Sequence, residues 1–393
     1  MTLPQPVPYS PKAEAQVFPF PAWQLIDPAA IPRTRFLYGK TFAAGYLSVT
    51  FAAPKTGKSL LALAEAIDAA TGRGFLTGQA ADPVRVLYYN AEDDQAVLDA
   101  RVSAVLQLWQ IPQSEIVGRV YVVSGVSVQN PVVLIRGEKG EIAESAFQGL
   151  ADLIRRERID LAIFDPLQDL SQSPETNEVF RALGGRIRAL AYDTGAAIGL
   201  VHHTRKPSPG IQPTLDDGRG GSALRGVARF NRLLVPMTEA EGAQAGVDDF
   251  RRFFRIGEAE SNLAPPSSDR NRWFEKVGVT IANGENVAAI KPWAWPDYFA
   301  GITTNDACRV RIAIGARENS PRENSQAKDW AGVLIADVLG LDLAKASDMA
   351  KAKAVLKTWV ENDVLRVEKQ TYGPKRKLAN FVVAGDNNPA VQE

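Results

Sequence analysis

The segment from Tyr46 to Ala62 consists of an apolar strand, a glycine-containing loop and the start of a helix. The loop ends in Gly57, Lys58 and Ser59, which match the end of the pattern G-x-x-x-x-G-K-[ST]. Backbone N–H groups of such a loop surround the β-phosphate at a helix N-terminus, the lysine reaches the β- and γ-phosphates, and the serine binds Mg²⁺. A chance Gly-Lys-Ser on a surface loop is disfavoured by the strand and the helix on either side. The segment therefore predicts a phosphate-binding loop.

The loop departs from the pattern at its first position, where Ala52 replaces glycine. Alanine is acceptable there if its φ angle stays below zero, and Pro54 stiffens the loop ahead of the tight turn. The residues that we expect to contact the nucleotide are Ala53, Pro54, Lys55, Thr56, Gly57, Lys58, Ser59 and Leu60.

The composition limits the remaining choices. With 393 residues, the chain exceeds the roughly 250 to 300 at which a single core usually divides, so we expect a large domain and at least one appendage. Lys and Arg together number 45, as do Asp and Glu, so nucleic-acid binding would have to come from local clusters. The single Cys308 cannot form an internal disulfide, and the N-terminus lacks an apolar leader, which favours the cytoplasm. No apolar run approaches the length of a membrane span.

Residues 46–237 alternate between short apolar runs and helical stretches, a pattern typical of a mostly parallel sheet with crossover helices and hence of the α/β class. The expected strands are 46–51, 84–89, 118–123, 160–165, 196–201 and 231–236. The expected helices lie near 57–70, 94–109, 145–157 and 177–193, with glycine-rich loops at 136–140 and 216–221. Three later segments, 252–256, 277–281 and 286–290, predict antiparallel strands that extend the sheet edge, the last two joined by a turn at Asn283-Gly284.

The expected organisation has five parts. Residues 1–34 are expected to form a proline-rich extended arm; the alternative interpretation is that they are disordered. The large domain that carries the phosphate-binding loop is expected over 35–300. A polar linker is expected over 301–324, and a small domain over 325–385 is followed by a tail over 386–393. The small domain reads as helix, helix and β-hairpin, which makes a winged-helix arrangement plausible.

Two acids follow predicted strands. Glu92 comes just after the strand 84–89, where a carboxylate beside the phosphate-binding loop can orient and deprotonate an attacking water. The alternative is an N-cap cluster for the next helix, a role that suits Asp93 and Asp94. Asp165 ends the strand 160–165, where a carboxylate can hold Mg²⁺ through water opposite Ser59; it can also be an ordinary strand terminus.

His202 and His203 are the only two histidines, and they end the predicted strand 196–201. The carboxyl edge of a parallel sheet faces the ligand crevice, so we expect one of them to sense the γ-phosphate. Zinc is the competing interpretation, but a single cysteine leaves too few ligands unless carboxylates complete the site.

Two groups of basic residues are candidates for DNA binding. In the core region, Arg205, Lys206 and Arg219 are candidates for phosphate contacts, and Arg229 or Arg232 for an arginine finger acting on the ATP of a neighbouring subunit. A solvated basic surface is the alternative. In the C-terminal module the candidates for gripping duplex phosphates are Lys353, Lys357, Lys375, Arg376 and Lys377. Helix amphipathicity alone would also place lysines outward, and nearby acids partly cancel the charge.

Together these segments resemble RecA-type ATPases, and specifically the RepA-like group of plasmid and phage replicative helicases. The resemblance covers about residues 35–295. The motifs that carry it are Ala-Pro-Lys-Thr-Gly-Lys-Ser, Asn-Ala-Glu-Asp-Asp, Ile-Phe-Asp-Pro-Leu, Gly-Leu-Val-His-His, Arg-Gly-Gly-Ser-Ala-Leu-Arg and Asn-Leu-Ala-Pro from Asn262. The resemblance implies ATP and Mg²⁺ as cofactors and a ring, most often a hexamer, that threads single-stranded DNA through its channel.

Residue roles follow from the same resemblance. Lys58 and Glu92 would be catalytic, with Glu92 activating water, and Asp165 would support Mg²⁺. The histidine pair would couple the γ-phosphate to DNA-binding loops, with His203 taken as catalytic and His202 as nucleotide-binding. Further implied contacts are Arg229 as a finger inserted in trans and Arg101, which matches a residue that borders the base.

One departure bears on the ring: Glu260 stands where related proteins often carry lysine, which puts trans-activated hydrolysis in question. The leading hypothesis is a cytoplasmic, Mg²⁺-dependent ATPase that works on DNA as a replicative helicase of a mobile element. The first alternative is a DNA-binding replication or regulatory protein in which ATP switches assembly without unwinding. The second is an ATPase that remodels a protein partner.

Overall fold

The computed structural model describes residues 22–204, 214–215, 221–261, 263, 272–373 and 377–387. The chain divides into two compact units, Met1–Thr34 and Arg35–Glu393. In the described part of the first unit, the only regular element is the short 3-10 helix η1 (Pro28–Ala30), capped by the Asp27 side chain. The apolar side chains of Trp23 and Leu25 are exposed there.

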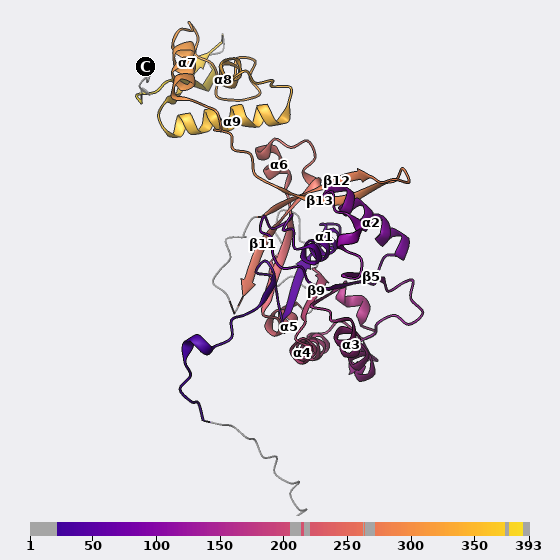
Figure 1. Cartoon of the computed structure of the whole chain (residues 1–393). Coiled ribbons are helices and arrows are strands. Elements are labelled where there is room, and N and C mark those ends of the chain that lie inside the picture. The colour runs from indigo at the N-terminus through magenta and orange to yellow at the C-terminus, as the bar shows by residue number, and fades with distance from the viewer. Residues whose placement is uncertain are drawn as a thin grey trace, which may run out of the picture. The chain divides into compact units, whose positions relative to one another are not determined.

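The second unit contains a nine-stranded sheet in the order β13-β12-β11-β10-β3-β9-β8-β4-β5 (Figure 1). From β10 to β5 in that order, neighbouring strands are parallel, whereas β11, β12 and β13 add an antiparallel edge. The parallel strands are β3 (Leu47–Ala52), β4 (Val86–Asn90), β5 (Val120–Ser124), β8 (Leu161–Asp165), β9 (Ala197–His203) and β10 (Phe230–Pro236). The antiparallel strands are β11 (Phe253–Ser261), β12 (Trp273–Thr280) and β13 (Asn286–Trp293). The predicted α/β class with an antiparallel extension is confirmed.

Helices cover both faces of this sheet. On one face, α1 (Lys58–Thr71) and α2 (Gln95–Leu108) pack in one core cluster. On the other face, α3 (Glu144–Glu157), α4 (Asn177–Thr194) and the short α5 (Gly221–Val227) pack in a second cluster (Figure 1). Successive residues of a strand point to opposite faces, and the central strands are buried along almost their whole length, so their apolar residues contribute to both cores. The predicted parallel strands and crossover helices agree with these bounds to within one or two residues.

Short elements complete the domain. A hairpin of β1 (Phe36–Tyr38) and β2 (Phe42–Ala43) precedes β3, and α6 (Glu239–Ala245) follows β10. The glycine-rich loop expected at 136–140 is the tip of a small hairpin formed by β6 (Ile135–Arg136) and β7 (Glu141–Ile142). The predicted turn at Asn283-Gly284 joins β12 to β13, and Gly284 there has φ +87°, a conformation that glycine adopts without strain.

The C-terminal part contains three helices and a hairpin among its described residues. These are α7 (Thr304–Gly315), α8 (Ala331–Leu339), α9 (Ala346–Glu361), β14 (Leu365–Tyr372) and β15 (Lys377–Ala384). The expectation of a linker over 301–324 is wrong for its first half, because α7 lies there. Thr303 and Asp306 form a capping box at its start, and Ala307, Val310 and Ile314 recur on one helical face and are buried in the C-terminal core. The polar residues 317–324, which follow the helix, make the segment as a whole resemble a linker in the sequence.

Across the described ranges, no helix combines the length and the apolar character needed to cross a membrane.

Candidate nucleotide-binding site

The phosphate-binding loop lies between β3 and α1. Gly57 is the N-cap of α1 with φ +121° and provides no side-chain cap, so the first N–H groups of the helix are left for an external acceptor. Ala52 ends β3 and is not among the described non-glycine residues with positive φ, so its substitution for glycine carries no backbone strain. Lys55 does have positive φ, at +66°. The geometry of the loop therefore fits a phosphate cradle.

The Glu92 carboxylate lies between the Lys58 side chain at the start of α1 and the His203 side chain at the end of β9. Its Oε2 is 3.4 Å from Lys58 Nζ, and its Oε1 is 3.5 Å from His203 Nε2. Lys58 is almost fully buried, whereas the side chain of Glu92 retains 39% exposure. Glu92 thus faces the cradle and remains accessible to water, as a base that activates water must.

Asn90, which sequence reasoning did not single out, fixes the loop that carries Glu92. Its buried Oδ1 accepts hydrogen bonds from the N–H groups of Glu92 at 3.0 Å and Asp93 at 2.7 Å. Its Nδ2 donates to Tyr88 Oη at 3.2 Å. An Asn at the end of a strand, two residues before the acid, is the sequence signal for such a turn.

Asp165 ends β8 and is completely buried. Its Oδ2 accepts a hydrogen bond from Tyr88 Oη at 2.8 Å, while Oδ1 has no hydrogen-bond partner and lies 3.6 Å from Lys58 Nζ. A buried carboxylate oxygen without a hydrogen bond is costly unless a cation or water satisfies it. Asp165 therefore suits the expected Mg²⁺ site, with Ser59 in the first turn of α1.

The two histidines have different surroundings. His203 shares the α1 face of the sheet with Ala52, its register partner in β3, and reaches Glu92. His202 is buried on the opposite face, with its ring edge-on to Phe51 at 5.9 Å and Phe180 at 5.1 Å between centroids. The expectation that both line the nucleotide site is corrected for His202, because adjacent strand residues point to opposite faces.

One further acid, Asp169, interacts electrostatically with the residues of the site. Asp169 lies in the 3-10 helix η3 (Leu167–Leu170), and burial together with the negative charge of Glu92 raises its pKa. Burial and the positive charge of Lys58 lower the pKa of His203, although Glu92 opposes this shift. His203 is therefore biased toward its neutral form.

The two acids that precede α2, Asp93 and Asp94, have different partners. Asp94 caps the helix by accepting from the N–H of Val97, whereas Asp93 forms an ion pair with Arg101. The N-cap interpretation thus applies to Asp94 and not to Asp93 or Glu92. The expected contact of Arg101 with the nucleotide stays a prediction, since its guanidinium is held by Asp93.

The arginines near β10 differ in accessibility. Arg232 is 5% exposed; it donates to Thr50 Oγ1 at 2.8 Å and forms an ion pair with the equally buried Glu65. The idea that it is an arginine finger is wrong, because a side chain locked in the core cannot reach a neighbouring subunit. Arg229 is exposed, and its finger role stays a prediction. Glu260 is paired with Arg225, with Nη2 to Oε1 at 2.6 Å.

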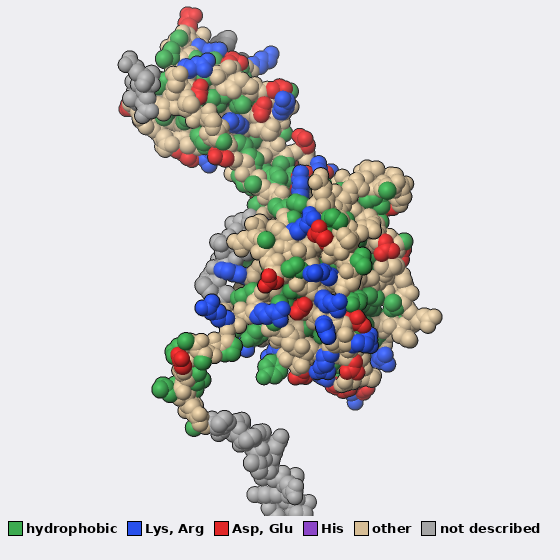
Figure 2. Space-filling model, viewed as in Figure 1, with side chains coloured by type: hydrophobic (Ala, Val, Ile, Leu, Met, Phe, Trp, Pro, Cys, Tyr) green, Lys and Arg blue, Asp and Glu red, His purple; other side chains and the backbone are tan. Residues whose placement is uncertain are grey.

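Several expected DNA contacts lie outside the described residues, namely Arg205, Lys206, Arg219, Lys375 and Arg376. The other candidates, Lys353 and Lys357 on α9 and Lys377 at the start of β15, are exposed. Figure 2 shows basic and acidic side chains interspersed on the visible face, in line with the balanced composition.

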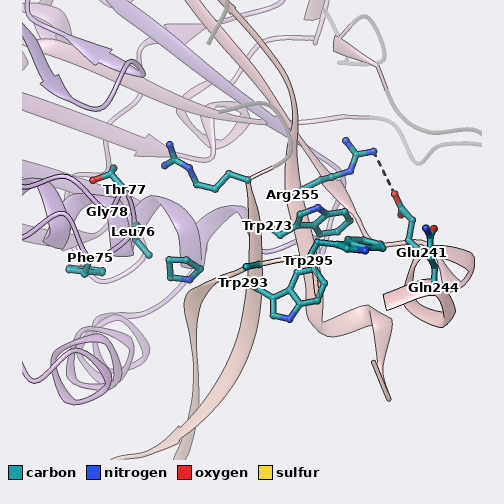
Figure 3. Close-up of a pocket in the computed structure, with 13 residues that line it drawn as sticks. Phe75, Leu76, Thr77, Gly78, Glu241, Gln244, Arg255, Trp273, Trp293 and Trp295 are labelled. Atoms are coloured by element: carbon teal, nitrogen blue, oxygen red, sulfur yellow. Dashed lines mark ion pairs between the residues drawn. The ribbon is translucent and has the colours of Figure 1, made fainter. Parts of the chain in front are cut away.

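A separate pocket of about 730 Å³ lies on the antiparallel edge (Figure 3). Trp273, Trp293 and Trp295 contact one another there at centroid distances of 5.7 to 5.9 Å, and Arg255 lies over the ring of Trp273 and forms an ion pair with Glu241. The lining contains no residue of the phosphate-binding loop. This aromatic cluster packs the edge strands and does not belong to the site around Glu92.

The sheet order, the open N-terminus of α1 and the buried Asp165 beside Lys58 together define a P-loop ATPase domain with a RecA-like fold. Residues 14–209 match the family model of the AAA domain. The matched range includes Lys58, Glu92, Asp165 and His203 and ends before Arg229 and the C-terminal module.

Proposed function

We propose that this protein is a Mg²⁺-dependent ATPase coupled to DNA, and specifically a ring-forming, RepA-like replicative DNA helicase of a mobile element. The observation that carries the proposal is the placement of Glu92, with one carboxylate oxygen near Lys58 and the other near His203. A single carboxylate thereby joins the phosphate cradle to the end of β9.

In the hydrolysis step, Glu92 would accept a proton from the attacking water, and Lys58 would bind the β- and γ-phosphates. Ser59 and Asp165 would hold Mg²⁺, which when bound supplies positive charge to the phosphate oxygens. Neutral His203 would hydrogen-bond Glu92 and respond to the loss of the γ-phosphate.

Coupling to DNA is supported by chain order. His203 is the last residue of β9, and the sequence continues within three residues to Arg205 and Lys206. A change at His203 would therefore be passed directly to a basic segment suited to single-stranded phosphates. In the C-terminal module, the winged-helix interpretation would let Lys353, Lys357 and Lys377 contact duplex DNA.

Ring assembly is supported by the exposed Arg229, which α5 and β10 hold at the domain surface. A finger supplied in trans requires a neighbour, and a closed ring provides one for every site. Related proteins often carry lysine at the position of Glu260. The negative charge that Glu260 introduces there is compensated by its ion pair with Arg225 of the same chain.

A forked-DNA unwinding assay tests the proposal, with Lys58→Ala as the matched inactive variant. The helicase interpretation predicts ATP-dependent strand displacement by the wild type alone. ATP-dependent assembly on DNA without displacement would instead support the switch protein. An ATPase that remodels a protein partner would be supported by two results together: an ATPase rate that does not change when single-stranded DNA is added, and DNA binding without a steep dependence on salt concentration.

A further inference from the structure

The antiparallel edge of the sheet reaches the phosphate-binding loop at two points. At one, a Cβ added to Gly57 would lie 2.9 Å from Cε1 of Phe254, a β11 residue whose ring stacks on Phe274 of β12. At the other, Lys276 of β12 donates a hydrogen bond from Nζ to the backbone carbonyl of Lys55 at 3.3 Å. Both edge strands lie beyond residues 14–209, so the matched domain does not contain these contacts.

Lys276 is not placed like an ordinary surface lysine. It is partly buried, and burial lowers its pKa, with the charge of Asp249 acting in the opposite direction. The carboxylate next to it in sequence, Glu275, is paired with Arg252 and Lys291. Among the described residues, no carboxylate forms an ion pair with Lys276, so its partial burial carries a cost in lost hydration, and the hydrogen bond to the loop offsets part of that cost.

The residue that Lys276 contacts is the unusual one in the loop. Lys55 has φ +66°, a left-handed conformation that is sterically unfavourable for a non-glycine residue. A charge-assisted hydrogen bond to its carbonyl favours that conformation over the alternatives. The orientation of the following N–H groups, which form the cradle, depends on the same backbone angles.

We propose that Lys276 is a positioning residue for nucleotide binding that acts within its own subunit by holding Lys55 in the left-handed conformation. The inference rests on ATP binding by the loop and is independent of DNA, ring formation and unwinding. It assigns to the antiparallel edge a role in preorganising the phosphate cradle.

The test measures the affinity of the full-length protein for a fluorescent ATP analogue with Mg²⁺ and without DNA. Lys276→Met should weaken binding about tenfold, the effect of losing one hydrogen bond from a charged group. Lys276→Arg should restore most of the affinity. In steady-state assays KM should rise while kcat changes by less than about threefold, as expected for lost ground-state binding. Lys291→Met, on the paired strand β13, is the matched control and should bind normally.

A double-mutant cycle separates positioning from direct phosphate contact. Glycine adopts positive φ without strain, so in a Lys55→Gly background Lys276→Met should cost much less affinity than in the wild type. An equal cost in both backgrounds would overturn the positioning role. Unchanged affinity of a folded Lys276→Met protein would overturn it as well; if that variant does not fold, Lys276→Gln, which keeps a donor and loses the charge, replaces it with the same criteria.

The test of Lys276 can fail or succeed independently of the proposed helicase function. A failure to unwind DNA leaves the nucleotide-affinity comparison intact. Wild-type protein that bound no ATP would remove the ATPase itself and not only the role of Lys276.

Discussion

His203 Nε2 lies 3.5 Å from Glu92 Oε1, although the two residues are 111 positions apart and belong to different strand ends. The contact depends on the order of the parallel strands, because β8 separates β9 from β4 in the sheet. It gives the site a carboxylate whose two oxygens face different partners, one at the start of α1 and one at the end of β9.

Glu92→Gln should keep ATP binding and lose turnover, because the amide cannot accept the proton of water. We expect kcat to fall about 10²- to 10⁴-fold, the range for removal of a general base. Phosphate release and nucleotide affinity, measured side by side, check this. Asp94→Asn is the control in the same loop: it alters a helix cap and should leave turnover nearly intact. Near-normal turnover by Glu92→Gln would remove Glu92 as the base.

The lowered pKa of His203 predicts a pH dependence of stability. Its pKa in the folded state lies below the ordinary value of about 6.5, so the unfolded state binds more protons between these two values. The contribution of His203 to stability is therefore fully present above about pH 6.5 and is lost as the pH falls through the lowered pKa. The charged groups that influence it are Lys58, Glu92 and Asp165, with Asp169 close by in the same field.

The measurement is the difference between wild type and His203→Gln in the free energy of unfolding across the acid range. Glutamine does not titrate, so the variant should lose less stability on acidification. Identical pH profiles for the two proteins would contradict a depressed pKa at His203.

Arg229→Ala should reduce ATP hydrolysis if the finger acts in trans, by a factor as large as about 10³ to 10⁵. Mixing it with Lys58→Ala should restore part of the activity, because some interfaces then combine an intact loop with an intact arginine. Phosphate release across mixing ratios checks this. A strictly additive response would indicate that Arg229 acts within its own subunit or not at all.

Arg232→Met should destabilise the protein, since it leaves Glu65 buried without its cation. The expected loss is about 3 to 5 kcal/mol in the free energy of unfolding. Arg232→Met combined with Glu65→Leu should recover much of it, because a well-packed apolar pair can replace a buried ion pair. Chemical denaturation measures both. Mixing Arg232→Met with Lys58→Ala should give no rescue of activity, which separates this arginine from Arg229.

Much of the fold was predictable from local patterns. The apolar runs that became β3, β4, β8 and β9, and the helix that starts at Lys58, are recognisable because each strand of a parallel sheet is buried on both faces. Helix α7 was missed because the polar stretch 317–324 that follows it makes the whole segment resemble a linker, and only packing with Trp330 in the C-terminal core shows the common face of Ala307, Val310 and Ile314.

The sequence by itself determined the chemistry of the loop and identified Lys58, Glu92 and Asp165, since motif spacing after a strand fixes which residues reach a sheet edge. Only the tertiary structure decided which neighbours these residues meet. Strand parity turned His203 toward Glu92 and His202 into the core, and burial of Glu65 made Arg232 structural. The antiparallel edge brought Lys276 to Lys55 across 221 positions of sequence. Such contacts depend on long-range packing, which local patterns do not encode.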